Sequence, residues 1–172
     1  NTSYFLIAKK LKYLLIFFNS RLFSYCFNKF YQSGGIEGEI TLQTLETIPL
    51  KKIESTTVFE ILADYLILLN DPNTPNIMEH ASNEMISQQL EEVLNMMIYE
   101  LYFEEHMKEK EIDVLQFINF PDISKMETFE EKQAAIQKIY YWLKEKDNPI
   151  RNRILVSESR SWIIKRINQS TH

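Results

Sequence analysis

The hydrophobic pattern at the start of the chain predicts one strand followed by two helices. Residues 3–8 alternate and are rich in β-forming side chains, which is typical of a strand. Residues 9–18 and 21–31 carry apolar side chains at helical spacing instead. Asn19 or Ser20 can cap the second helix, because a side-chain oxygen there accepts a backbone N–H left unpaired at a helix start. We therefore expect two helices that meet at this Asn-Ser step.

A glycine-containing segment then precedes a second predicted strand. The Gly34–Gly35 pair permits a tight turn with positive φ. Residues 37–42 alternate between apolar and polar and predict a strand, and residues 42–45 predict a short helical turn that Pro49 ends. Residues 1–54 are thus expected to form a small strand–helix–helix–strand unit.

From residue 55 onward the pattern predicts helices alone. Ser55 is placed to cap a helix that continues to Leu69, and the Asn- and Pro-rich segment 70–76 breaks it. Residues 78–107 predict one long helix, and residues 111–117 predict a shorter one. The apolar stripe of the long helix comprises Ile86, Leu90, Val93, Leu94, Met97 and Leu101.

Two further helices are expected near the end of the chain. Thr128 and Glu131 form a capping-box pattern, which predicts a helix over residues 129–146. The last helix is expected over residues 157–167. The side chains expected to point inward are Ile136, Ile139, Tyr140 and Leu143 in the first of these helices, and Trp162, Ile163 and Ile167 in the second.

Together these elements predict an α+β fold that is predominantly α. We expect the small unit at 1–54 to be followed by a helical domain at 55–172, with the loop 70–76 as an internal break. The scarcity of glycine (3) and proline (5) agrees with long helices, and the apolar share of 45% permits a sizeable core. Because the chain opens with Asn1 and a strand pattern, we expect a piece of a longer protein that begins inside a domain.

Cysteine usage and the length of the apolar runs indicate a soluble cytoplasmic protein. The single cysteine, Cys26, excludes an internal disulfide and a multi-cysteine metal site, and its apolar surroundings predict a buried, inert thiol. The apolar run at 13–18 is far shorter than the roughly 20 residues that cross a bilayer. We therefore expect a reducing compartment and no membrane partner.

The net charge of −5 hides an uneven distribution along the chain. Residues 1–32 hold five basic residues and no acidic one, and residues 149–172 hold five basic residues and one acidic one. Residues 56–148 hold seven lysines against nineteen acidic residues. A polyanion would be repelled by the middle of the chain and attracted to its ends.

Aromatic side chains interleave with the basic residues of 1–32. Aromatic rings with lysine and arginine bind nucleic acid by base stacking and phosphate contact, although the same rings at helical spacing also suit a core. For the lysines we expect phosphate contact, and Arg21 suits either a base or a phosphate. The basic residues of this segment are Lys9, Lys10, Lys12, Arg21 and Lys29.

One segment carries a pattern found in metal-dependent endonucleases. Asp122 after Pro121, followed by Glu130 and Lys132, matches the PD…ExK order, in which carboxylates hold a divalent ion. That chemistry expects Glu130 and Lys132 on one face of a strand. The capping box places them on a helix instead, where positions two apart diverge by about 200°. The three histidines lack the spacing of metal ligands, and no Gly-rich phosphate loop is present.

Several short motifs follow one another through residues 2–53. They are an aromatic strand at 4–7, a helix ending in Phe-Asn-Ser-Arg-Leu at 18–22, an aromatic helix at 25–31, a Gly-rich segment at 34–38 and Leu-Glu-Thr-Ile-Pro at 45–49. This order resembles the C-terminal part of the TaqI-like specificity domain of Type IIG restriction–modification enzymes and related adenine methyltransferases. The family commonly has leucine where Phe18 stands and often has a basic residue where Glu37 stands. Residues 56–118 resemble the helical tail of that domain through Ile-Tyr-Glu-Leu-Tyr at 98–102.

The resemblance implies a DNA sequence-recognition module of a prokaryotic cytoplasmic enzyme. With the acid-free segment at 1–32, it makes the candidate DNA contacts Lys9, Lys10, Lys12, Arg21, Lys29, Ser33, Gly34 and Gly35. Such enzymes methylate adenine N6 with S-adenosylmethionine, and those that also cleave DNA use Mg²⁺. The Asn/Asp-Pro-Pro-aromatic motif and the Gly-rich cofactor loop of the methyltransferase are absent from the 172 residues. We therefore expect no catalytic or cofactor-binding residue here, and expect as partners double-stranded DNA and an N-terminal methyltransferase domain of the same chain.

Two alternative functions stay open at this point. The first is a helical protein-interaction module without DNA binding, which the acidic middle and the Met-rich residues 85–107 favour. The second is a divalent-metal nuclease site at 121–132.

Overall fold

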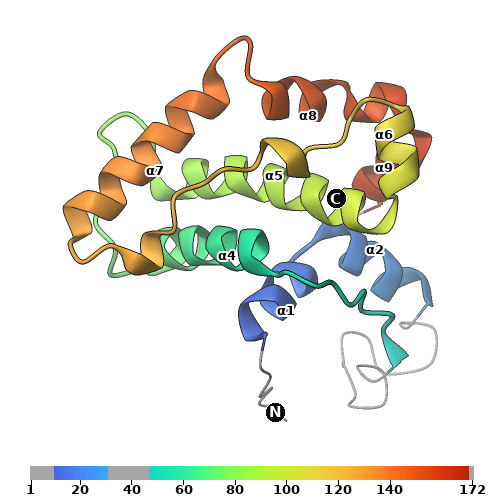
Figure 1. Ribbon diagram of the computed structural model, residues 1–172, viewed down its shortest axis with the longest axis horizontal. Coiled ribbons are helices and arrows are strands. Elements are labelled where there is room, and N and C mark those ends of the chain that lie inside the picture. The colour runs from blue at the N-terminus through green and yellow to red at the C-terminus, as the bar shows by residue number, and fades with distance from the viewer. Residues whose placement is uncertain (1–9, 31–46, 171–172) are drawn as a thin grey trace.

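The computed structural model describes residues 10–30 and 47–170, which form eight α-helices and two short 3₁₀-helices without a strand (Figure 1). The predicted α+β class is therefore wrong for the described residues, which are all helical. The predicted strands at 3–8 and 37–42 and the turns at 34–35 and 42–45 lie outside the described residues. The helices are α1 (Leu11–Phe18), α2 (Arg21–Phe30), α4 (Thr57–Asn70), α5 (Asn83–Tyr102), α6 (Glu104–Glu109), η2 (Leu115–Phe117), η3 (Ile123–Lys125), α7 (Phe129–Lys144), α8 (Pro149–Arg160) and α9 (Trp162–Gln169).

Helix α5 lies at the centre of the fold. Helices α2, α4, α6 and α8 contact it directly, while α1 packs on α4 and α9 packs on α2 and α8. Figure 1 shows α4 and α5 side by side, with α1 and α2 below them and α7 and α8 above. Every residue of α5 from Val93 to Leu101 is buried. Over this stretch α5 is enclosed on all sides, unlike a surface helix with one apolar stripe.

One hydrophobic core connects the described helices on both sides of residue 54. The ring of Tyr13 on α1 packs edge-on against Phe59 of α4 at 5.5 Å between centroids. Phe17 of α1 stacks on Tyr102 of α5 at 5.8 Å. Buried side chains from α1 to α9 belong to the same cluster. The division into domains at 1–54 and 55–172 stays a prediction, but the described parts of both share a core.

The junction between α1 and α2 confirms the predicted cap. Ser20 is fully buried, and its Oγ accepts the Phe23 N–H at 3.2 Å while donating to the Phe17 carbonyl at 2.7 Å. Asn19 donates from Nδ2 to the Leu15 carbonyl at 2.8 Å. Asn19 therefore caps the C-terminal end of α1, and Ser20 caps the N-terminal end of α2.

The segment predicted as one helix over 78–107 is two helices. α5 begins at Asn83 because the Oγ of Ser82 accepts the Met85 N–H at 3.2 Å. Phe103 leaves helical geometry at φ −125° and ψ 39°, and α6 starts at the next residue. The predicted apolar stripe of α5 is confirmed, because all six of its residues are buried.

The helix predicted over 111–117 is wrong, and only the single turn η2 forms there. The chain reverses after α6, where Glu111 adopts φ 54° and the Ile112 N–H donates to the Met107 carbonyl at 2.9 Å. The buried carboxylate of Glu100 then accepts the N–H groups of Val114 and Leu115, the second at 2.7 Å. These bonds from a distant helix replace the ones a local helix would make.

Helix α7 confirms the predicted capping box. Thr128 Oγ1 accepts the Glu131 N–H at 3.2 Å, and Glu131 Oε2 accepts the Thr128 N–H at 3.2 Å. The helix ends at Lys144, two residues earlier than predicted. All four side chains predicted to point inward from it are buried.

The single helix predicted over 157–167 is divided at Ser161 into α8 and α9. Ser161 leaves helical geometry at φ −130°, and its Oγ accepts the Ile164 N–H at 3.3 Å, which starts α9. Trp162, which was predicted to point inward, is 71% exposed, and Ile163 is half-buried. Ile167 is buried as predicted, and Ile164 is buried as well.

The start of α4 also differs by one residue from the prediction. The helix begins at Thr57, and Ser55 precedes its N-cap residue, Thr56, with its Oγ 3.4 Å from the Thr57 N–H. The helix ends at Asn70, so the predicted break at 70–76 is confirmed.

Two observations bear on the expected surroundings of the chain. Cys26 on α2 is half-buried rather than buried, and desolvation raises the pKa of its thiol. Within residues 10–30 and 47–170, none of the helices has the length and apolar character required to cross a membrane.

Replacing Ser20 with alanine tests the cap between α1 and α2. The change leaves the buried Phe23 N–H without its acceptor, so we expect a loss of about 1–2 kcal/mol in the free energy of unfolding. Urea denaturation followed by circular dichroism measures it. Ser159→Ala is the matched control, because Ser159 is exposed and bonds only within its own helix, to the Val156 carbonyl. Equal losses in both variants would contradict the capping role.

The Glu100 carboxyl group predicts a pH dependence. Burial raises its pKa above the ordinary value, although the N–H groups of Leu115 and Val114 act in the opposite sense. The folded state therefore binds this proton more tightly than the unfolded state, and ionisation of Glu100 destabilises the fold at neutral pH. The thermal midpoint of the wild type relative to Glu100→Gln should rise as the pH falls from 7 toward about 4.5.

Thermal unfolding of both proteins at several pH values measures this difference. Glu130→Gln, at an exposed carboxyl group on α7, serves as the control. If the difference in thermal midpoint between the wild type and Glu100→Gln does not change with pH, the proposed effect of burial on the pKa of Glu100 is contradicted.

Candidate functional site

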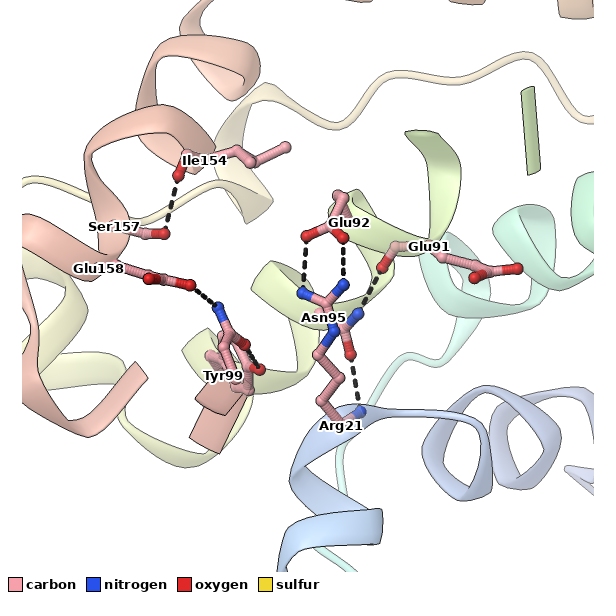
Figure 2. Close-up of polar contacts among 9 residues, drawn as sticks. Arg21, Glu91, Glu92, Asn95, Tyr99, Ile154, Ser157 and Glu158 are labelled. Carbon is pink, nitrogen blue, oxygen red and sulfur yellow. Dashed lines mark hydrogen bonds and ion pairs between the residues drawn. The ribbon is translucent and has the colours of Figure 1, made fainter. Parts of the chain in front are cut away.

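Helices α2, α5, α8 and α9 meet around a polar cleft of about 470 Å³, which we call the four-helix cleft. Figure 2 shows Arg21 reaching from α2 toward Glu92 and Asn95 on α5, with Ser157 and Glu158 of α8 on the far side. The polar side chains that line it are Arg21, Glu92, Asn95, Tyr99, Ser157, Glu158 and Asn168.

Arg21 binds Glu92 through both ends of its guanidinium group. Nη1 donates to Glu92 Oε2 at 2.8 Å, and Nη2 donates to Oε1 (Figure 2). Burial alone would lower the pKa of Arg21, but the hydrogen bonds and the charge of Glu92 outweigh it and raise the pKa. Such two-point pairing holds the planar guanidinium in one orientation and keeps it charged.

Asn95 joins the same group to the start of α2. Its Oδ1 accepts the backbone N–H of Arg21 at 2.8 Å, and its Nδ2 donates to the Glu91 carbonyl at 2.9 Å. The side chain is 4% exposed, so both bonds are needed to satisfy a buried amide. A residue of α5 therefore satisfies one of the N–H groups that α2 leaves unpaired at its first turn.

A second chain of hydrogen bonds crosses the cleft from α5 to α8. Tyr99 donates from its hydroxyl to Asn168 Oδ1 at 2.6 Å, and Asn168 Nδ2 donates to Glu158 Oε1 at 2.7 Å. Burial raises the pKa of Tyr99, and Glu92 and Glu158 raise it further, while Arg21 acts against them. The hydroxyl therefore stays a donor at neutral pH and fixes α9 against α5.

The four-helix cleft holds its helices together and is poorly suited to an anion. It carries two carboxylates, Glu92 and Glu158, against the single guanidinium of Arg21. Its polar side chains bond to one another or to nearby backbone groups, and both ends of the Arg21 guanidinium group bind Glu92. A phosphate placed here would meet a net negative charge.

Of the other predicted DNA contacts, the structure describes Lys10, Lys12 and Lys29. Lys12 forms an ion pair with Asp64 of α4, at 2.6 Å between Nζ and Oδ1. Lys10 is exposed and donates to the Ile53 carbonyl at 3.4 Å, and Lys29 is exposed in the last turn of α2. Lys9, Ser33, Gly34 and Gly35 lie outside the described residues. The structure thus places two of the eight candidates against carboxylates and leaves two described lysines at the surface without an ion pair.

Helix α9 carries a basic surface that sequence reasoning did not single out. Trp162, Lys165, Arg166 and Gln169 are all exposed, and their spacing of three, four and seven residues places them on one side of the helix. We call these four residues the α9 face. The excess of basic residues in 149–172 was visible in the sequence, but Trp162 was predicted to lie in the core. α9 packs beside α2, so the basic ends of the chain are neighbours.

The nuclease-like residues of 121–132 serve as local caps. The Oδ1 of Asp122 accepts the Ser124 N–H at 3.1 Å, and its Oδ2 pairs with Lys125 at 2.9 Å. Hydrogen bonding by Ser124, followed by Lys125, lowers the pKa of Asp122. Glu130 is exposed at the start of α7, as the capping box predicted. In the part of the chain that the structure describes, no three His, Cys, Asp or Glu side chains are grouped as metal ligands.

Neither a protein-family model, nor a curated protein, nor a solved structure matches the chain.

A double-mutant cycle tests whether Arg21 acts within the protein. We expect Arg21→Ala and Glu92→Ala each to reduce the free energy of unfolding, with a coupling between them of about 1 kcal/mol, because Glu92 is partly exposed. Arg21→Lys should recover little of the loss, since lysine cannot make the two-point contact. Chemical denaturation of the wild type, the two alanine variants and the double alanine variant measures the coupling.

The exposed pair of Glu104 and Lys108 on α6 provides the comparison, and its coupling should be the smaller of the two. Zero coupling between Arg21 and Glu92 would show that the guanidinium is available for another partner.

Proposed function

We propose that this chain is a DNA-binding module of a restriction–modification enzyme that methylates adenine N6, and that α2 and α9 contact the duplex backbone. The observation that carries the proposal is the packing of α2 against α9. It brings together segments that are basic at opposite ends of the sequence. The order of motifs in residues 2–53 supports the same family of enzymes.

The cations of this surface are free to bind phosphate. Lys29, Lys165 and Arg166 are exposed, and none of the ion pairs among the described residues includes them. Lys12 and Arg21 differ, because each would have to leave a carboxylate before it could bind DNA. We therefore expect the exposed cations of α2 and α9, rather than Lys12 and Arg21, to contact the DNA phosphates.

The acidic start of α7 is compatible with DNA at this surface. The acidic first turn of α7 holds Glu130 and Glu131, and α7 lies at the opposite end of the long axis from α9 (Figure 1). Exposed charges separated by more than about 10 Å are largely screened at moderate salt. The net charge of −5 therefore does not prevent a local basic surface from binding a polyanion.

The double substitution Lys165→Glu/Arg166→Glu tests the proposal. We expect the affinity for a labelled DNA duplex to fall at least about tenfold, because two phosphate contacts are replaced by repulsion. The dependence of log affinity on log salt should become shallower by about 2. Fluorescence anisotropy at several salt concentrations measures both quantities.

Lys138→Glu/Lys146→Glu is the matched control, since it makes the same change in net charge at exposed lysines in and just after α7. It should leave the affinity within about twofold. Equal losses of DNA affinity in both double variants would show that only the net charge of the protein matters. If the wild type does not bind a duplex, the proposed function is rejected.

A further inference from the structure

We propose that Trp162 stacks on a DNA base lying outside the duplex stack, while Lys165 and Arg166 hold the adjoining phosphates. The α9 face would then be a binding site for single-stranded or extruded nucleotides. This inference rests on the proposed function, because it takes DNA as the ligand, and it adds the form of DNA that the surface selects.

The environment of Trp162 differs from that of the other tryptophan. Trp142 is half-buried and packs edge-on against Phe120 at 6.4 Å. Trp162 is 71% exposed and begins α9. An exposed aromatic ring by itself carries no assignment, because isolated apolar side chains are common at surfaces. Whether the ring of Trp162 can bind a ligand depends on the charges beside it and on the rigidity of the helix that carries it.

The helix beneath the ring is firmly held. Ser161 is 1% exposed, its Oγ accepts the Ile164 N–H, and it lies 2.8 Å from Nε2 of His106 on α6. Ile164 and Ile167 anchor the opposite face of α9 in the core. A flat ring on a fixed helix loses little conformational freedom when a ligand stacks on it, which favours binding.

The charges beside the ring match a polyanion. Lys165 and Arg166 follow Trp162 by three and four residues and so lie on the same side of α9. α9 itself contains no acidic residue, and the α8 carboxylate that reaches it, Glu158, accepts a hydrogen bond from Asn168 Nδ2 at 2.7 Å. Of the three carboxylates on neighbouring α6, those of Glu104 and Glu109 are ion-paired to Lys108 and Lys110. A ring flanked by two unpaired cations suits the alternation of base and phosphate along one strand.

Geometry separates the forms of DNA that this face can bind. The bases of a duplex already stack on one another, so only their edges reach the grooves. The face of a base becomes available to an aromatic ring when the strand is single or the base is extruded. Lys165 and Arg166 can contact phosphates in both forms, whereas Trp162 adds affinity for the unpaired form alone.

Fluorescence of Trp162 gives a direct test. The chain has two tryptophans, so Trp142→Phe leaves Trp162 as the single reporter. We expect an oligothymidylate of about 12 nucleotides to quench this emission and a duplex of equal length to leave it nearly unchanged. In the otherwise wild-type chain, Trp162→Ala should weaken single-strand binding about tenfold and duplex binding by less than about twofold.

Two substitutions distinguish stacking from apolar contact at the same position. Trp162→Phe retains a ring and should keep most of the single-strand affinity, whereas Trp162→Leu should lose as much as Trp162→Ala. Equal affinities of the Phe and Leu variants would overturn stacking. Thermal melts of all the variants check that the fold is intact, which is expected because the side chain is exposed.

The remaining outcomes separate this inference from the proposed function. Duplex binding with neither quenching nor an effect of Trp162→Ala would overturn the stacking site and leave the DNA-binding function standing. Binding to neither form would reject both. Self-association that Trp162→Ala abolishes, without DNA binding, would assign the α9 face to protein contact and overturn the inference.

Discussion

The fold depends on satisfying the polar groups of a helix that is buried on all sides. Between Val93 and Leu101, α5 carries the buried polar side chains of Asn95 and Glu100 among apolar neighbours. Leaving such a group without a partner costs about 1–3 kcal/mol. Asn95 finds its partner in the first N–H of α2, and Glu100 finds two in the turn at 114–115. These bonds determine where α2 begins and where the chain turns after α6.

The same constraint arranges the surface. Tyr99, also on the enclosed part of α5, binds Asn168 and so fixes α9 alongside α2. The polar groups of the four-helix cleft bond mainly to one another, and Arg21 is held by Glu92. On the outside, α9 presents cations that have no carboxylate partner among the described residues. Basic residues of the chain therefore divide into those that hold the structure together and those open to a ligand.

Local features of the fold could be predicted because they involve residues a few positions apart. The Ser20 cap, the capping box of Thr128 and Glu131, and the apolar stripe of α5 are all of this kind. The breaks at Phe103 and Ser161 could not be predicted, because helical spacing continues across both. Ser161 shows the reason, since it is held by His106, 55 positions away. Trp162, the next residue, lies at the surface rather than in the predicted core.

The sequence by itself determined most helical segments, their caps and the basic character of the chain ends, since these follow from composition and short-range spacing. Only the tertiary structure decided which basic residues are free. Lys12 and Arg21 have no acidic neighbour within residues 1–32, yet they pair with Asp64 and Glu92, which lie 52 and 71 positions away. Charge pairing depends on distance in space, and packing around α5 sets that distance. For the same reason, the basic ends of the chain became neighbours only when α9 packed against α2.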